Sequence, residues 1–283
     1  MLQPWMIPSD LASGDAKSLE RDWSAITLHR IQSTEDPLFA MAFGALWAEF
    51  GAIDEIEPAS VLASRMQWDG RSLVNGCALR YRMMLFTAAD QFAAVRDHTA
   101  IVQDGKPGAV VHLSHNLVSP EWRRSGLAGW LRALPIQTAR NCLAAQNRPS
   151  DSPIILVAEM EHLDPGDAAS LVRYKAYEKA GYLKVDPRRV NYMQPDFRPA
   201  EEIDFDGLKP LPLALLVRRI GREKESRISG AEVRDIAGAL YRMYATGFRE
   251  CDMAPLFSSL EKYPADDEFI PLLPPMTDIT PCR

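Results

Sequence analysis

The residues of this chain best suited to chemistry lie in a turn, 117–129, which follows an apolar, strand-like run and opens an apolar-periodic helix. The first N–H groups of a helix lack internal partners and the helix dipole favours negative charge there, so such a turn suits phosphate. Gly126 permits a close backbone approach that a side chain would block, and Arg123 and Arg124 add positive charge. We therefore expect this turn to bind a phosphate group.

The turn also carries the spacing Val-x-Pro-x-x-Arg-x-x-Gly-x-Ala, formed by Val118, Pro120, Arg123, Gly126 and Ala128. This spacing resembles the pyrophosphate-binding motif of the GNAT superfamily of acyl-CoA N-acyltransferases. A lone glycine-rich turn is a weak indication, because many loops carry such residues for turn geometry alone. A second segment, Tyr-Glu-Lys-Ala-Gly-Tyr at 177–182, follows in the expected order. It resembles the family's Tyr-x-Lys-x-Gly-aromatic segment, and two ordered motifs together favour the family.

The resemblance implies acetyl-CoA as the acyl donor. It implies that the backbone of Leu117 and Val118 pairs with the pantetheine arm and that the N–H groups of 124–129 cradle the pyrophosphate. Where the family often has an Asn, seven residues before Tyr177, this chain has Ser170, which is a departure from the pattern. The full set of cofactor-binding residues that we predict is Leu117, Val118, Arg123, Arg124, Ser125, Gly126, Leu127, Ala128, Gly129, Ser170 and Tyr174.

Transfer of an acyl group to an amine needs a base for the amine and an acid for the departing thiolate. Tyr177 stands where family members commonly place that acid, and a phenol has a proton to give at neutral pH. The alternative is that Tyr177 only packs its helix against the sheet.

The base is left open among four residues on two predicted strands. His115 occupies the position where many relatives carry a carboxylate, and His112 resembles a histidine of the arylalkylamine acetyltransferases. Strand alternation would put the two histidines on opposite faces, unless a bulge typical of this strand realigns them. Glu159 and Glu161 share one face of the neighbouring strand and are the carboxylate alternatives.

Periodicity indicates the elements that must position these residues. Alternation and apolar runs predict strands at 25–31, 78–86, 92–102, 109–116, 153–161, 189–194 and 212–220. Apolar periodicity and capping residues predict helices at 38–50, 59–67, 126–145, 164–180 and 229–247. Pro135 predicts a kink or break in its helix, and Asp164 is the expected N-cap of the helix that it precedes. We expect a polar turn at Asp69, an acidic loop at 201–206 and an irregular tail after 247.

These elements predict an α/β fold of the α+β type, a mixed and mainly antiparallel sheet flanked by helices, as the GNAT resemblance implies. At 283 residues and 47% hydrophobic, the chain can bury one large core. We divide it into a flexible polar arm at 1–22, an acyltransferase domain at 23–221, and a C-terminal helical extension with a Pro-rich tail at 222–283.

The composition limits the function classes. A formal charge of −6 argues against a general nucleic-acid or membrane-surface binder, because such proteins are usually basic. Five histidines and four scattered cysteines show no metal-ligand spacing, so we expect no metal and reduced thiols. The N-terminus lacks the apolar core of a signal peptide, and no stretch reaches the length of a membrane span. We expect a cytoplasmic protein, with its oligomeric state, including a homodimer, left open.

The predicted function is transfer of an acetyl group from acetyl-CoA to a small-molecule or peptide amine, directly and in a ternary complex. One alternative is a non-catalytic acyl-CoA-binding or sensing protein that keeps the cofactor site without a route for protons. Another is an enzyme that uses a different acyl-CoA or an acyl-carrier protein. The acidic residues at 201–206 hint at a cationic acceptor, although a solvated acidic loop is the commoner explanation.

Overall fold

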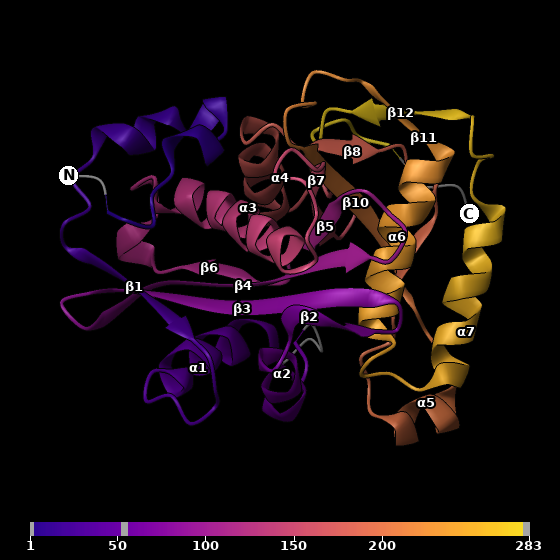
Figure 1. Cartoon of the computed structure of the whole chain (residues 1–283), viewed down its shortest axis with the longest axis horizontal. Coiled ribbons are helices and arrows are strands. Elements are labelled where there is room, and N and C mark those ends of the chain that lie inside the picture. The colour runs from indigo at the N-terminus through magenta and orange to yellow at the C-terminus, as the bar shows by residue number, and fades with distance from the viewer. Residues whose placement is uncertain (1–2, 52–55, 280–283) are drawn as a thin grey trace.

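An antiparallel meander forms one half of a large sheet (Figure 1). The computed structural model describes residues 3–51 and 56–279. The strands of the meander are β1 (Ile26–Ile31), β2 (Asp69–Val74), β3 (Cys77–Ala88) and β4 (Gln91–Gln103). β3 pairs with β1, β2 and β4, and its pairing with β4 extends over nearly the whole length of both strands. The strands predicted at 78–86 and 92–102 are confirmed, whereas β2 begins where a turn is predicted at Asp69.

The other half of the sheet contains one parallel pair among the described residues, β5 (Ala109–His112) with β7 (Ile154–Met160). Beyond β7 the order is β10 (Leu211–Arg219), β8 (Leu183–Val185), β12 (Phe269–Leu273) and β11 (Arg227–Ser229). β6 (Asn116–Val118) pairs with β4, and β9 (Tyr192–Gln194) pairs with β10. The sheet is therefore mixed and mainly antiparallel, which confirms the predicted fold class.

The segment that joins β5 to β6 contains one residue more than the stretch of β4 that it faces. Arg96 of β4 is paired with Asn116, and Thr99 of β4 is paired with His112, so three steps along β4 match four steps along the opposite chain. This is the geometry of a β-bulge, which shifts the alternation of side chains between the two faces of a sheet. The expected strand at 109–116 is thus two short strands with an irregular stretch between them.

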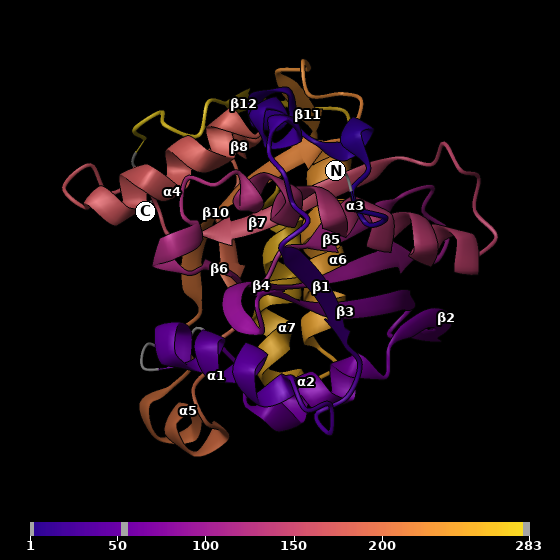
Figure 2. The same cartoon turned by 90° about the vertical axis from the view of Figure 1, so that its left-hand side faces the viewer.

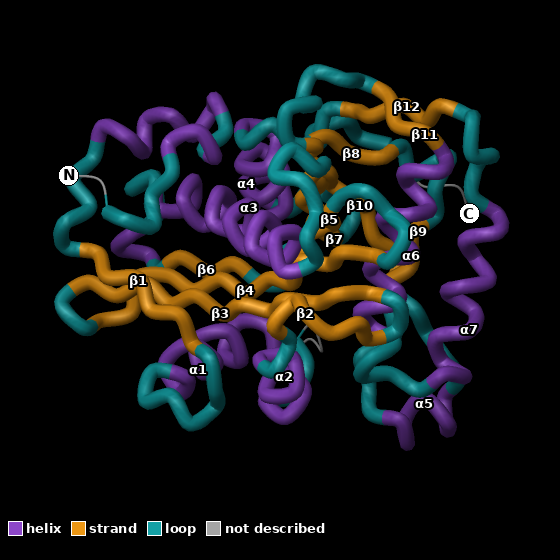
Figure 3. Tube along the Cα trace, viewed as in Figure 1, coloured by secondary structure: helices purple, strands orange, loops and turns teal. Residues whose placement is uncertain are grey.

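Helices cover both faces of the sheet (Figures 1 and 3). α3 (Leu127–Ala145) and α4 (Ala168–Lys179) pack on one face, where Ala100, Val102 and Leu156 lie in their core. α1 (Phe39–Phe50), α2 (Ala59–Met66) and α6 (Gly230–Tyr244) pack on the opposite face. A view turned by 90° shows α3 and α4 above strands β1, β3 and β4 and α1 and α2 below them (Figure 2). We refer to these faces as the α3–α4 side and the α1–α6 side.

The N-terminal residues are packed, although their polar composition predicts a loosely held arm at 1–22. Residues 3–22 include two 3-10 helices, Pro8–Asp10 and Ser13–Glu20, which lie along α3. Trp5 is buried edge-on against Phe86 and Trp130. Further along the arm, Asp15 makes a buried bidentate ion pair with Arg132 of α3. Apolar and ionic contacts therefore fix this segment to the helix that carries the glycine turn.

Two helix predictions are wrong in detail. α3 continues without a break through Pro135, because the residues beside it, Leu134 and Ile136, are buried in the core and hold the helix. Asp167 rather than Asp164 is the N-cap of α4, where its carboxylate accepts the N–H groups of the first turn. Asp164 instead accepts the N–H of Gly166 and closes the preceding turn.

Two segments predicted as irregular form regular structure. The acidic residues at 201–206 belong to α5 (Ala200–Asp206), which an ion pair between Asp204 and Arg249 ties to the later chain. The tail contains α7 (Glu250–Ser259) and β12, whose buried side chains include Leu256 and Ile270. Burial of these apolar residues against α6 and β8 explains why a Pro-rich segment is ordered.

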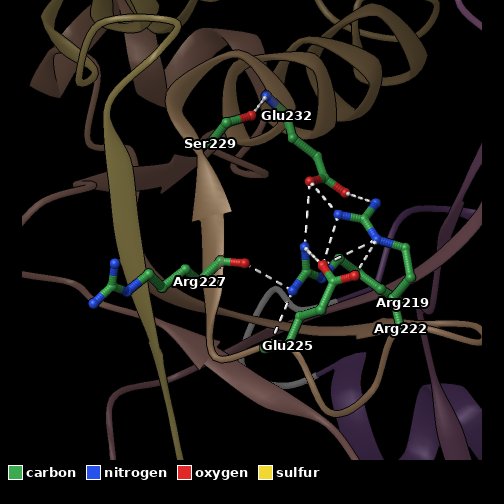
Figure 4. Close-up of polar contacts among 6 residues, drawn as sticks. All are labelled: Arg219, Arg222, Glu225, Arg227, Ser229 and Glu232. Carbon is green, nitrogen blue, oxygen red and sulfur yellow. Dashed lines mark hydrogen bonds and ion pairs between the residues drawn. The ribbon is translucent and has the colours of Figure 1, made fainter.

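The C-terminal extension is joined to the sheet by a cluster of charges at the start of α6 (Figure 4). Glu232 accepts hydrogen bonds from Arg219 at the end of β10 and from Arg222, and both arginines also pair with Glu225. Ser229 caps α6 by accepting the N–H of Glu232, as its capping-box sequence predicts. Since β12 pairs with β8, the predicted boundary at 221/222 divides segments that share one sheet.

We predict that Asp15→Ala lowers the free energy of unfolding by about 3–5 kcal/mol, because it leaves the guanidinium of Arg132 buried without its partner. Urea unfolding at neutral pH measures this loss. Glu20→Ala is the matched control, since Glu20 is exposed on the same 3-10 helix and its removal should change stability by no more than about 0.5 kcal/mol. Equal midpoints for both variants would contradict the structural role of the arm.

Candidate active site

A cleft of about 430 Å³ opens where β6 and β7 diverge. β5 and β7 are paired as far as His112 and Val157, and the N–H of Leu113 extends this pairing by one bond. Beyond this point β6 pairs with β4 alone, while β7 continues to Met160. The cleft is lined from the α3–α4 side by Ala128 and Tyr177, and from the α1–α6 side by residues that include Phe50, Phe197 and Tyr244. It therefore passes through the sheet.

The glycine turn lies at the α3–α4 side of this cleft, at the N-terminus of α3. Gly126 has φ +97°, a conformation that side chains disfavour, and it directly precedes the first helical residue. The N–H of Leu127 donates to Ser125 Oγ and that of Gly129 to the carbonyl of Gly126. Among the described residues, the N–H groups of Gly126 and Ala128 have no hydrogen-bond partner. These groups, together with the exposed Arg123 and Arg124, are suited to hold a phosphate.

The N-terminal arm contacts the same turn. Ser18 Oγ donates to the carbonyl of Gly126 at 2.9 Å. A Cβ added at Gly129 would lie 2.9 Å from Ser18 Oγ and 3.0 Å from the side chain of Asp15, so no larger residue fits there without displacing the arm. Both glycines are therefore needed for helix packing as well as for approach by a ligand.

The remaining predicted cofactor residues divide into two groups. Leu117 and Val118 are not among the residues that line the cleft, but they lie on β6, which pairs with β4 on one edge and has no strand partner on the other among the described residues. Ser170 and Tyr174 do not line the cleft. Ser170 Oγ accepts the N–H of Asp164, and the Tyr174 hydroxyl donates to the carbonyl of Glu161, so both tie α4 to the end of β7.

Tyr177 lines the cleft from α4 and is half-buried. Its ring packs edge-on against Tyr182, with centroids 4.9 Å apart. Tyr177 lines the cleft on the same side as Ala128 of the glycine turn, which is consistent with its predicted role as the acid. The same contact also accounts for its packing role.

His112 is the centre of a buried network on the α1–α6 side. Its Nε2 lies 2.6 Å from Glu159 Oε2, and its Nδ1 lies 3.1 Å from Ser114 Oγ. The hydroxyl of Tyr244 donates to the same carboxylate oxygen at 2.6 Å, and Tyr192 donates to the other oxygen. Since Nε2 faces a carboxylate, it is assigned the proton, and Nδ1 then accepts from Ser114. Ser114, His112 and Glu159 thus form a hydrogen-bonded chain with Ser114 at the cleft.

The carboxyl group of Glu159 is charged within this network. Burial alone would raise its pKa, but the neighbouring His112 and the hydrogen bonds from His112, Tyr192 and Tyr244 outweigh burial and lower the pKa below its usual value. A carboxylate held in this way stabilises a positive charge on the ring of His112.

His115 has its own orienting partner, Asp97 of β4. Asp97 Oδ1 accepts both the N–H and the Nδ1 of His115 at 2.8 Å, and the hydroxyl of Tyr81 donates to the other oxygen. Burial opposes the charge on Asp97, but the interactions with His115 and Tyr81 lower its pKa well below the usual range. His115 and His112 both line the cleft, so the bulge realigns them onto one face.

Glu161 lies at the rim, where it is exposed and pairs with Arg173. The sequence reasoning did not identify Ser114, Asp97, Tyr192 or Tyr244 as site residues. Tyr244 belongs to a regular apolar stripe of α6 and Asp97 to a long strand, so only the fold shows that their polar atoms meet the histidines. Among the described residues, no helix is long and apolar enough to cross a bilayer, and no three His, Cys, Asp or Glu side chains are grouped to hold a metal ion.

The strand order, the bulge, the divergence of β6 from β7 and the glycine turn facing that gap agree with the family resemblance. The chain has a GNAT-like fold. No family model and no curated protein matches it. Among solved structures, an acetyltransferase from Streptococcus agalactiae shares 10% identity over 69% of this chain and 98% of its own, with a TM-score of 0.37.

Two other solved structures give similar values. An aminoglycoside acetyltransferase from an uncultured soil metagenomic sample shares 12% identity over 55% of this chain and 89% of its own, with a TM-score of 0.32. A tandem GNAT protein from the clavulanic acid biosynthesis pathway shares 16% identity over 84% of this chain and 64% of its own, with a TM-score of 0.35. Likeness at this level carries no information about the substrate or mechanism of this chain.

We predict that Glu159→Gln lowers the free energy of unfolding at pH 7 by about 1–3 kcal/mol, because an amide cannot accept all the donors that converge on the carboxylate. The folded-state pKa of Glu159 is lowered, so its stabilisation is present above the usual value of 4.5 and is lost as the pH falls through the folded-state pKa. Urea unfolding from pH 7 to pH 3 should show the variant approaching the wild type. A constant difference across this range would contradict a charged Glu159.

Proposed function

We propose that this chain is an acyl-CoA-dependent N-acyltransferase that moves an acetyl group from acetyl-CoA to an amine by direct transfer in a ternary complex. The observation that carries the proposal is the cleft that passes through the sheet. Tyr177 lies on its α3–α4 side with the phosphate-suited turn, and the two histidines lie on its α1–α6 side. Two substrates entering from opposite faces would meet between an acid and a base.

Direct transfer requires the amine to lose a proton while its nitrogen attacks the thioester carbon. Acetyl-CoA supplies the activated acyl group when bound. On the α1–α6 side, Ser114 can take a proton from the amine as it gives its own to His112 Nδ1. Glu159 then stabilises the imidazolium that forms. Tyr177 is placed to return a proton to the departing thiolate, so the proton balance closes within the cleft.

His115 is the second candidate for the base. Its ring is fixed by Asp97, whose carboxylate favours a positive charge on the imidazole in the same way as Glu159 does for His112. The acceptor remains an amine of unspecified structure. Its half of the cleft is lined by Phe50, Phe197 and Tyr244, which favours an amine with an apolar body.

Calorimetric titration with acetyl-CoA and with CoA tests the donor site. We predict a dissociation constant in the micromolar range that is lost in Gly126→Glu, because the side chain would add a negative charge at the turn and strain a residue with φ +97°. Gly105→Glu is the matched control: Gly105 has φ +71°, has open space around it and does not line the cleft. Absence of binding to either ligand by the folded wild type would refute the acyltransferase proposal.

Turnover with a panel of amines tests the catalytic roles. Substitution of the true base, as His112→Gln or His115→Gln, should lower kcat by about 10²–10⁴-fold, and Tyr177→Phe should also lower kcat with little change in donor affinity. His29→Gln is the control, since His29 bonds Thr87 on β3 and does not line the cleft. Tight acetyl-CoA binding without turnover for any amine would instead favour a non-catalytic acyl-CoA-binding protein.

A further inference from the structure

Arg96 is a buried guanidinium without a partner in the described part of the chain. Arg96 is 1% exposed, and its Nε, Nη1 and Nη2 atoms form no hydrogen bond to residues 3–51 and 56–279. An arginine side chain keeps its proton under all ordinary conditions, so it cannot avoid burial of charge by titrating. Burying an unpaired charge is costly, which makes this group unlike the other arginines of the core.

Arg96 lies on the α3–α4 side of the sheet and is not itself one of the residues that line the cleft. Arg96 and His98 are two residues apart on β4, so their side chains point to the same face, where His98 bonds Thr138 of α3. Arg96 is paired in register with Asn116 of β6. Asn116 lines the cleft, and its buried Oδ1 also lacks a partner among the described residues. Asp97, the adjacent carboxylate, points to the opposite face, where it binds His115 and Tyr81.

Charges around this point do not balance. The positive charges of Arg96, Arg218 and Arg132 all act on the phenol of Tyr182, whose buried hydroxyl has no partner among the described residues either. Arg132 is paired with Asp15, and Arg218 with Glu223. The charge of Arg96 therefore has no paired carboxylate among the described residues, and it acts on the hydroxyl of Tyr182, which can donate a hydrogen bond.

His98 adds no second positive charge to this region. Its burial, followed by the charge of Arg96, lowers its pKa from 6.5 to about 3, so the ring is neutral at physiological pH. The excess is one unit of positive charge in a site from which bulk water is largely excluded.

We propose that Arg96 binds an anionic oxygen group of the acyl donor. This inference rests on the proposed function. The planar guanidinium can bind two oxygens of a carboxylate or phosphate at once, and Tyr182 can donate a further hydrogen bond. Asn116 Oδ1 is an acceptor suited to an amide N–H, which the pantetheine arm carries.

Two groups of a donor have this chemistry: a carboxylate at the far end of a dicarboxylic acyl group, and the pyrophosphate of CoA. The register favours the carboxylate. Arg96 is paired with Asn116, directly before Leu117 at the gap between β6 and β7, whereas the phosphate-suited turn lies further along, at 124–129. In this case the proposed acyl-CoA-dependent transfer is kept, but the acyl group would be dicarboxylic, as in succinyl-CoA, in place of the acetyl group proposed above.

The test uses Arg96→Met, which keeps the length of the side chain without its charge, and Arg96→Lys, which keeps the charge without the planar fork. Arg82→Met is the matched control, because Arg82 lies on the same face of the neighbouring strand β3 and its guanidinium donates to the carbonyl of Tyr81. Without ligand, Arg96→Met should unfold at a temperature equal to or above that of the wild type. A lower unfolding temperature would show a structural partner for Arg96 and overturn the proposal.

Affinities for CoA, acetyl-CoA and succinyl-CoA then identify the anion. A loss of about tenfold or more in Arg96→Met that is confined to succinyl-CoA, with partial rescue by Arg96→Lys, supports the acyl carboxylate. An equal loss for all three ligands supports the pyrophosphate. Unchanged affinity for all three ligands overturns the proposal.

Thermal stabilisation by inorganic pyrophosphate and by succinate separates this proposal from the proposed function. If the wild type binds none of the three CoA ligands, the acyltransferase proposal fails by itself. Stabilisation of the wild type by either small anion, lost in Arg96→Met and kept in Arg82→Met, would still support an anion site at Arg96. The anion site fails as well if neither anion stabilises the wild type.

Discussion

The single extra residue between β5 and β6 is the constraint on which the site depends. It allows Asn116 to pair with Arg96 while His112 pairs with Thr99, and it turns His115 onto the face that already carries His112. It also ends the pairing with β7, which opens the gap through the sheet. Without this residue, regular alternation would place the two histidines on opposite faces and a continuous parallel pair would close the cleft.

The two sides of the cleft satisfy their polar groups differently. On the α1–α6 side, the carboxylates of Glu159 and Asp97 each accept several hydrogen bonds, with donors from His112, His115 and three tyrosines. Such networks fix the histidine rings before any substrate arrives. On the α3–α4 side, the N–H groups of the turn and the guanidinium of Arg96 lack protein partners among the described residues. The proposed base therefore lies on the side whose carboxylates are hydrogen-bonded within the protein, and the proposed anion site on the side with unpartnered donors.

Much of the fold follows from local sequence. The strands β1, β3, β4 and β7 and the helices α3 and α6 are predicted within a few residues, because long periodic segments, Gly turns and the Ser229 capping box each specify their own local structure. Errors occur where distant contacts decide. Leu256 and Ile270 order a Pro-rich tail by packing on elements far away in sequence, and buried neighbours keep α3 continuous at Pro135.

Several residues of the candidate site could be predicted from the sequence, but the contacts between them could be predicted only in part. The glycine turn, Tyr177 and the set of His112, His115, Glu159 and Glu161 come from motifs and strand order. The pairing of His112 with Glu159 and of His115 with Asp97 depends on the bulge, which the sequence allows without specifying. The sequence does not single out Tyr244 or Arg96, because an aromatic residue in an apolar stripe and a basic residue in a strand are common. Only their surroundings in the fold distinguish them.

The contribution of Tyr244 has a consequence for biosynthesis. Its hydroxyl completes the network around Glu159 from 85 residues further along the chain, whereas Asp15 and Arg132, which secure the glycine turn, are both made before β7. A growing chain released only as far as α4 would already contain the phosphate-suited turn and its supporting arm. The network around Glu159 is completed only when α6 docks, so translation produces the glycine turn and its supporting arm before the last residue of this network.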